Sequence, residues 1–158
     1  MPLNRVLPLL VALLAVAGCQ SATGPRQLVS VSLTVDQTTL KPGDSVLVTV
    51  NITNESPGPV TISGSFCPPP FVVRNAAGAV VGPAASICPT VLTVRTLAPR
   101  QTIVLHTAWR GDASVPGITG TAFVAPGTYA LQGRVGAADG LVESAPVSVV
   151  VQGASSTS

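Results

Sequence analysis

The most restrictive feature of this sequence is a two-residue alternation of aliphatic and polar side chains that recurs along most of the chain. It is clearest at residues 29–35, where Val29, Val31, Leu33 and Val35 alternate with serine and threonine. Because successive side chains of a β-strand point to opposite faces, this period is typical of a half-buried strand. Valine, isoleucine and threonine also favour strands. The pattern therefore predicts a β-sheet protein.

Glycine and proline, 15 of each, separate the alternating segments at regular intervals. No segment combines the 3.6-residue period of an amphipathic helix with the absence of these breakers. The expected strands occupy residues 29–35, 46–52, 60–62, 71–74, 80–81, 91–97, 103–109, 128–135 and 147–151. Some eight or nine short strands of this kind predict an all-β fold, an immunoglobulin-like antiparallel β-sandwich.

The first 18 residues differ in character from the rest. Arg5 precedes an apolar run at residues 6–17, broken only by Pro8, and these 12 residues are too few to span a bilayer, which needs roughly 20. This is the layout of a secretory signal. The tetrapeptide that follows the leucines, Val16-Ala17-Gly18-Cys19, resembles the lipobox of bacterial lipoproteins.

The lipobox resemblance implies that residues 1–18 are removed and that Cys19 carries the lipid, because only a thiol forms the diacylglycerol thioether. Residues 19–27 then make a polar linker, residues 28–152 the β-sandwich and residues 153–158 a disordered tail. Several acyl chains anchor a protein stably, so we expect it in a bacterial cell envelope, bound to the membrane. Gln20 is not the aspartate that retains some lipoproteins inside, which favours the outer membrane in a host with two membranes.

Two further cysteines, Cys67 and Cys88, form an even pair in an exported chain, which predicts a disulfide. The bridge would close a loop of about 20 residues and contribute roughly 3 kcal/mol in the chain-entropy model. The competing interpretation joins both thiols and His106 in a metal site. That site needs a fourth ligand and tight spacing, which the sequence does not show, so no metal or other cofactor is expected.

Charge and aromatic content limit the partners of the chain. Without Arg5 the formal net charge falls from +2 to +1, and aromatic residues make up 3% of the sequence. This composition predicts no nucleic-acid binding. His106 lies in an expected strand and no serine sits in a Gly-x-Ser-x-Gly elbow, so the sequence predicts a non-enzymatic protein. Trp109 and Tyr129 are expected in the core or at a strand corner.

A series of short motifs carries a family resemblance. In order, they are Val48 to Asn54 with Pro59-Val60-Thr61-Ile62, then Phe71-Val72-Val73-Arg74-Asn75-Ala76-Ala77-Gly78, then Leu97-Ala98-Pro99 with Ile103 to Trp109, and Pro126-Gly127-Thr128-Tyr129. The region from residue 46 to about 135 resembles the BsuPI-type intracellular proteinase inhibitor domain, a β-sandwich. The resemblance implies a protein that binds proteases and has no enzymatic activity.

Two segments are candidate contact loops for a protein partner. One is the region closed by the expected disulfide, and the other is the polar segment of residues 110–125, which begins with Arg110-Gly111-Asp112. This tripeptide also spells an integrin-type adhesion signal, although such tripeptides arise by chance. The alternative function keeps the fold alone: Leu40-Lys41-Pro42-Gly43-Asp44 resembles the strand entry of generic bacterial Ig-like repeats, which would make the chain a structural spacer or an envelope assembly subunit.

Overall fold

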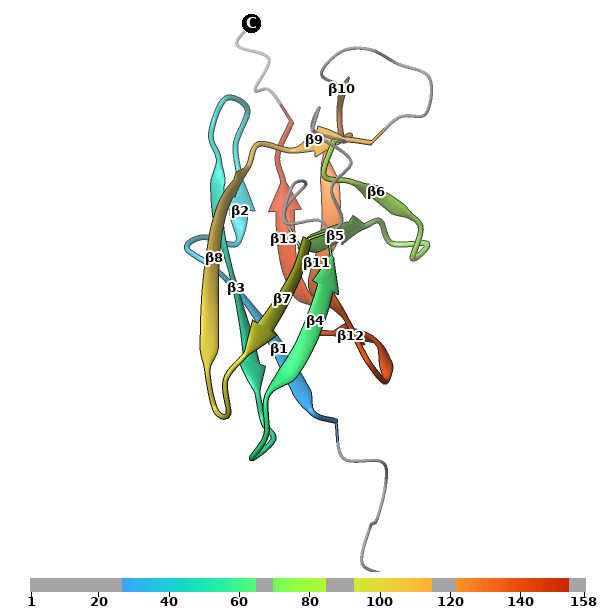
Figure 1. Ribbon diagram of the computed structural model, residues 1–158. Coiled ribbons are helices and arrows are strands. Elements are labelled where there is room, and N and C mark those ends of the chain that lie inside the picture. The colour runs from blue at the N-terminus through green and yellow to red at the C-terminus, as the bar shows by residue number, and fades with distance from the viewer. Residues whose placement is uncertain (1–26, 65–69, 85–92, 115–121, 154–158) are drawn as a thin grey trace, which may run out of the picture.

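The computed structural model describes residues 27–64, 70–84, 93–114 and 122–153. Every regular element in these ranges is a strand (Figure 1). The strands are β1 (Val29–Val35), β2 (Thr39–Leu40), β3 (Val46–Asn54), β4 (Val60–Gly64), β5 (Phe71–Arg74), β6 (Val80–Gly82), β7 (Thr93–Leu97), β8 (Thr102–Trp109), β9 (Asp112–Ala113), β10 (Ala122–Phe123), β11 (Gly127–Ala137), β12 (Gly140–Glu143) and β13 (Val147–Val151). Within the same ranges, no helix is long and apolar enough to span a membrane.

Two larger sheets pack face to face around one core, and a separate two-stranded sheet pairs β9 with β10. The first has the order β1-β3-β8, and the second runs β2-β13-β11-β4-β7, with β12 and β5 joined to β11 and β6 joined to β5 (Figure 1). All pairs are antiparallel except that of β13 with β2. This confirms the predicted all-β, immunoglobulin-like sandwich. The described residues form thirteen strands where eight or nine were expected, because the sequence alternation did not mark β2, β9, β10 or β12.

The core is built by the inward-facing half of each alternating strand. In β3, Val46, Val48, Val50 and Ile52 are all fully buried, while the residues between them are exposed or half-buried. The second sheet contributes Ile62, Val73, Leu131 and Val149, also fully buried, to the same cluster. Burial of each such side chain contributes about 1.5–3 kcal/mol. The two-residue period thus fixes which face of each strand meets the other sheet.

Strand β11 lies at the centre of the second sheet and changes partners along its length. Along one edge it pairs with β13 and then β12, and along the other with β5 and then β4. Its inward residue Gly133 lets the two sheets approach closely: an added Cβ would lie 3.0 Å from Cγ1 of Val31 and 3.1 Å from Cγ1 of Val50. A side chain at this position would push the sheets apart.

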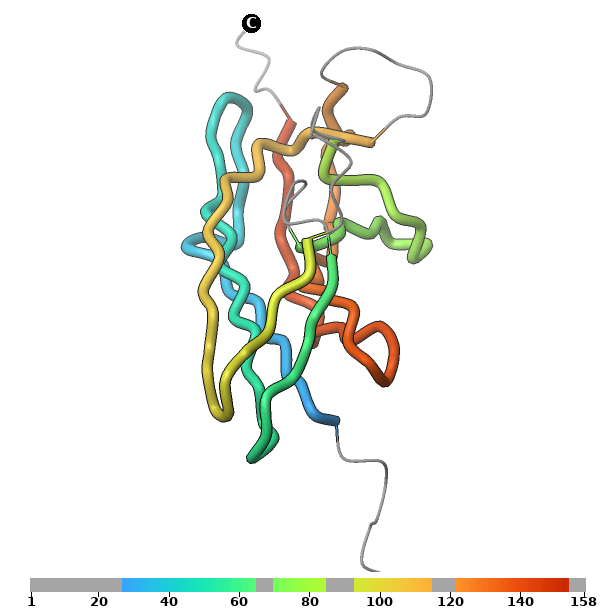
Figure 2. Tube along the Cα trace, in the orientation of Figure 1, coloured from blue at the N-terminus to red at the C-terminus, as the bar shows by residue number. Residues whose placement is uncertain are grey.

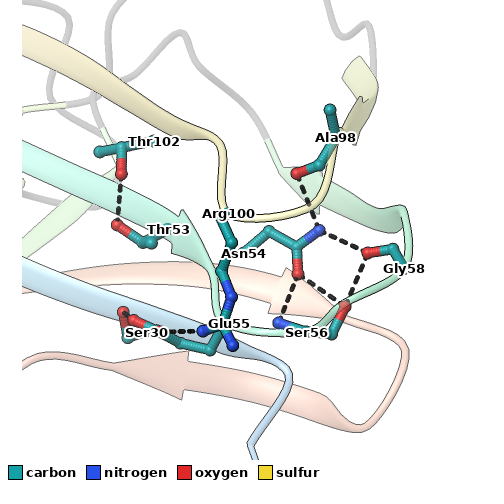
Figure 3. A network of polar contacts seen from close by, with 9 residues as sticks. All are labelled: Ser30, Thr53, Asn54, Glu55, Ser56, Gly58, Ala98, Arg100 and Thr102. Carbon is teal, nitrogen blue, oxygen red and sulfur yellow. Dashed lines mark hydrogen bonds and ion pairs between the residues drawn. The ribbon is translucent and has the colours of Figure 1, made fainter.

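Asn54 occupies the last inward position of β3 and is fully buried. Its Nδ2 donates to the backbone oxygens of Gly58 (2.8 Å), Leu97 (3.1 Å) and Ala98 (3.0 Å), while its Oδ1 accepts from the amide of Ser56 (2.9 Å). The side chain therefore joins the turn after β3 to the turn between β7 and β8 (Figure 3). A polar group in the core is stable here because its hydrogen bonds are satisfied.

The sandwich has two opposite ends, which the strand register defines. At the entry pole, the chain enters at Leu28, and the turns at residues 55–59 and 98–101 lie beside it, since Val29 pairs with Asn54 and Thr53 with Thr102. The distal pole comprises residues 40–44, 109–113, 122–126 and 151–153, because Val46 pairs with Trp109 and Val151 with Leu40. Figure 2 shows these poles at the bottom and top of the molecule. The nine residues of β3 separate them by about 30 Å.

Candidate functional site

The distal pole contains a pocket of about 340 Å³, here called the distal pocket. Its lining comes from four separate parts of the chain: Leu40, Lys41, Pro42 and Gly43; Arg110 and Gly111; Phe123, Val124 and Pro126; and Val151, Gln152 and Gly153. The volume lies at the lower end of the range for small-ligand sites. Most of the lining is aliphatic, aromatic or glycine, so the pocket offers an apolar interior.

Two buried aromatic side chains hold two neighbouring segments of the distal pocket in place. Trp109, at the end of β8, donates from Nε1 to the backbone oxygen of Asp112 at 3.2 Å and so fastens the segment that carries Arg110 and Gly111. Tyr129, near the start of β11, donates from its hydroxyl to the oxygen of Ala125 at 2.7 Å. The two rings meet edge to face with centroids 6.3 Å apart. This confirms the predicted core and corner positions of Trp109 and Tyr129, and the hydroxyl contact is that of a tyrosine corner.

Backbone hydrogen bonds join the remaining walls. The amide of Val124 donates to the backbone oxygen of Gly111 at 2.7 Å, and the amide of Gln152 donates to the backbone oxygen of Leu40 at 2.8 Å. Gly111 has a φ of +79°, and an added Cβ would lie 3.2 Å from Cδ2 of Leu40, so this position suits glycine. The described lining is therefore largely fixed before any ligand arrives, which lowers the entropic cost of binding.

The distal pocket is cationic. Lys41 and Arg110 line it, and no aspartate or glutamate does. All six acidic residues of the chain lie in the described ranges, so this absence covers every acidic side chain. Two acidic residues, Asp44 and Asp112, directly follow lining residues without lining the pocket themselves. The carboxylate of Asp112 binds backbone amides: its Oδ2 accepts from Ala84 at 2.6 Å and its Oδ1 from Arg110 at 3.3 Å.

Phe123 is the most exposed aromatic side chain of the described residues, with 64% of its surface accessible. The other described aromatic residues, Phe71, Trp109 and Tyr129, are buried. The chain has few aromatic residues, and burial of this phenylalanine in the core would stabilise the fold. Its exposure at the wall of an apolar pocket is therefore unusual. Its position is consistent with a role in binding.

The structure separates the members of the predicted Arg110-Gly111-Asp112 loop. Arg110 and Gly111 line the distal pocket, whereas Asp112 begins β9 and uses its carboxylate within the domain. Gly111 is buried. This geometry does not favour the adhesion signal, which would present the aspartate to a partner. The candidate contact segment contributes Phe123 and Val124 as well, and its residues 115–121 lie outside the described ranges.

Several other predictions concern residues outside the described ranges. Cys19 lies in residues 1–26, Cys67 in residues 65–69 and Cys88 in residues 85–92, so the lipidation and the disulfide stay predictions. His106 is described: it is exposed on the outer face of β8, as expected, with Nδ1 3.0 Å from the hydroxyl of Thr49. Among the described residues, no group of three or more potential metal ligands comes together.

Sequence reasoning missed the other walls of the distal pocket. Residues 40–44 were expected to lead into a strand, and residues 147–151 were expected to form one, but neither segment was connected with a site. The connection depends on the parallel pairing of β13 with β2, in which Val151 meets Leu40. One signal was available: the lysine in the Leu40-Lys41-Pro42-Gly43-Asp44 turn is one of only eight Lys and Arg residues in the chain.

Comparisons with known proteins leave the family open. No family model matches the chain, and no curated protein matches it. Among solved structures, a Pseudomonas fluorescens alkylpurine DNA glycosylase bound to DNA is similar over 80% of this chain and 31% of its own, with 10% identity and a TM-score of 0.46. An Erythrobacter marinus β-glucosidase is similar over 78% of this chain and 15% of its own (11% identity, TM-score 0.45).

A third similar structure, a CARDB domain from Pyrococcus furiosus, is covered over 87% of its length, and 78% of this chain is covered (11% identity, TM-score 0.41). The chain thus spans less than a third of the glycosylase and the glucosidase. At TM-scores below 0.5, these likenesses carry no inference about family or activity. The resemblance to the BsuPI-type domain stays a prediction.

Proposed function

We propose that this protein is a membrane-anchored, non-enzymatic lipoprotein whose β-sandwich presents its distal pole to a protein partner in the bacterial cell envelope. The observation that carries the proposal is the separation of the two poles. The linker that follows Cys19 reaches the domain at the entry pole, and the distal pocket lies about 30 Å away at the other end. A lipid on Cys19 would leave the distal pole free to meet a partner.

The lining of the distal pocket supports binding rather than catalysis. None of its described residues is a serine, cysteine, histidine, aspartate or glutamate, the side chains that most often act as nucleophile or general base. It offers instead an exposed aromatic side chain, a firm apolar wall and two cations. Aromatic and arginine side chains are the residues that contribute most energy to protein interfaces.

The BsuPI-like motifs suggest that the partner is a proteinase. We expect the mature protein, titrated against a panel of subtilisin-like proteases, to inhibit at least one of them at micromolar concentration. Phe123→Ser should weaken this inhibition at least tenfold, since a buried aromatic contact at an interface contributes about 2 kcal/mol or more. Leu141→Ser is the matched control, because Leu141 on β12 is equally exposed, at 62% against 64%.

Each outcome of the titration has a distinct meaning. Inhibition that Phe123→Ser weakens and Leu141→Ser leaves intact supports an inhibitor that acts through the distal pole. Equal effects of the two substitutions would place the contact elsewhere on the sandwich. A complete lack of inhibition would remove proteinases as partners and would leave two alternatives, another envelope protein or a structural spacer without a partner at this pole.

A further inference from the structure

The chemistry of the distal pocket narrows the kind of partner segment that fits it. This step rests on the proposed function, namely that the distal pole meets a protein. We infer that the pocket takes the free carboxyl terminus of a polypeptide whose last residue is apolar. The carboxylate would meet Lys41 and Arg110, and the last side chain would enter the apolar interior against Phe123.

The charge of the pocket is the first argument. Lys41 and Arg110 come from different parts of the chain, β2–β3 and β8–β9, and the fold brings both to one small pocket. Neither forms an ion pair with a described acidic residue: Glu143 pairs with Arg74 and Glu55 pairs with Arg100, both away from the pocket. Because no acidic side chain lines the pocket, an incoming anion would provide the missing counter-charge.

The size and the apolar wall are the second argument. Leu40, Pro42, Val124 and Val151 surround the interior, and a volume of about 340 Å³ is small. An internal segment of a partner would have to enter and leave this space. A chain end enters once and carries its carboxylate directly beside its last side chain, so the apolar and anionic groups arrive together. Capture of terminal carboxylates is an established mode of peptide recognition.

The third argument is that the described walls are held firmly. Arg110 is placed by the hydrogen bond from Trp109 to Asp112, and the 124–126 segment is placed by Tyr129. The carboxylate of Asp112 accepts backbone amides instead of pairing with the guanidinium: its Oδ2 accepts from Ala84 and its Oδ1 from Arg110. Lys41 and Arg110 therefore line a preorganised apolar pocket, and an anionic apolar ligand loses little on ordering the site.

Fluorescence polarisation with labelled peptides tests the inference on the full mature chain in nanodiscs, with empty nanodiscs as the blank. The probes are a peptide ending in Ala-Val-Leu as a free acid, the same peptide as its C-terminal amide, and a free acid ending in Ala-Val-Glu. We expect the leucine acid to bind at least tenfold more tightly than either of the others. Its binding should weaken as salt rises, because the attraction between charges is screened.

Substitution of the cations gives the matched comparison. Lys41→Glu with Arg110→Glu should reduce binding of the leucine acid at least tenfold and leave the amide unchanged. Arg134→Glu, at an exposed arginine of β11 outside the pocket, should change neither. Circular dichroism and the melting temperature show whether each variant is folded. If the double variant does not fold, the single variants Lys41→Gln and Arg110→Gln provide the same comparison with smaller changes.

Equal binding of the acid and the amide, or of the pocket variant and the wild type, would overturn the inference. The proposed function would survive this result if crosslinking of the membrane-anchored protein still shows a partner protein at residue 123. If neither the peptide acid binds nor any protein contacts Phe123, the proposed function fails as well. Tighter binding of the leucine acid that depends on Lys41 and Arg110 would support both the inference and the proposed function.

Discussion

Replacing Asn54 by alanine is expected to lower the free energy of unfolding by about 3 kcal/mol, a large part of the stability of a domain of this size. The alanine removes one donor group that serves the oxygens of Gly58, Leu97 and Ala98, and one acceptor that serves the amide of Ser56. Buried groups that lose a partner cost about 1–3 kcal/mol. The two turns at the entry pole would also lose their link.

Two further variants make this prediction specific. Asn51 lies in the same strand and makes one exposed hydrogen bond of 3.3 Å to the hydroxyl of Ser32. Asn51→Ala should therefore lower the free energy of unfolding by less than about 1 kcal/mol. Asn54→Asp keeps the size and one acceptor but directs an oxygen at three carbonyl oxygens, and it should destabilise at least as much as alanine. Urea unfolding followed by tryptophan fluorescence measures all three, since Trp109 is fully buried. A similar loss for Asn51→Ala and Asn54→Ala would contradict this account of the network.

Replacing Cys19 by serine is expected to abolish lipid attachment completely. A hydroxyl does not form the thioether that the lipobox implies, so labelled palmitate should enter the wild-type protein and be absent from the variant. Without lipid the variant should also keep residues 1–18, because the signal peptidase for lipoproteins acts on the lipidated cysteine. Metabolic labelling with an alkyne palmitate, together with the intact mass of the protein, measures both effects.

The other two cysteines are the controls for this experiment. Cys67→Ser and Cys88→Ser should keep the palmitate label and the processed mass. Each should lose the predicted disulfide, with a lower melting temperature that corresponds to roughly 3 kcal/mol in the chain-entropy model. Label that persists in Cys19→Ser, or that disappears in Cys67→Ser, would show that the lipid is not on Cys19.

Strands with a long alternation were predictable from the sequence. The expected ranges of residues 29–35 and 147–151 coincide with β1 and β13, and β3 and β8 differ from expectation by one or two residues at their ends. These strands are predictable because each has one buried face, which produces the alternation of apolar and polar residues. The short strands β2, β9 and β10 have two residues each, too few for a period to show. Strand β12 has four residues and begins at Gly140, which already pairs with Ala137 of β11.

The candidate site was predictable only in part. Arg110 and Gly111 were expected in a contact segment, and they line the distal pocket. The opposite wall depends on the pairing of β2 with β13, elements far apart in the sequence, and local patterns do not specify such pairing. Asn54 is similar: its buried position follows from the alternation in β3, but its contact with Leu97 and Ala98 depends on how the two hairpin turns meet. Long-range contacts of this kind are set by tertiary packing.

The central claim is that one pole of the sandwich is anchored and the other binds a partner. Site-specific photo-crosslinking in intact cells tests it most directly, with p-benzoylphenylalanine placed at residue 123 or at residue 141 of the lipidated protein. Phe123 and Leu141 are equally exposed, at 64% and 62%, but only Phe123 lies at the distal pocket. The account predicts a discrete protein adduct from residue 123 and none from residue 141. Adducts from residue 141 alone, or equal adducts from both positions, would contradict it.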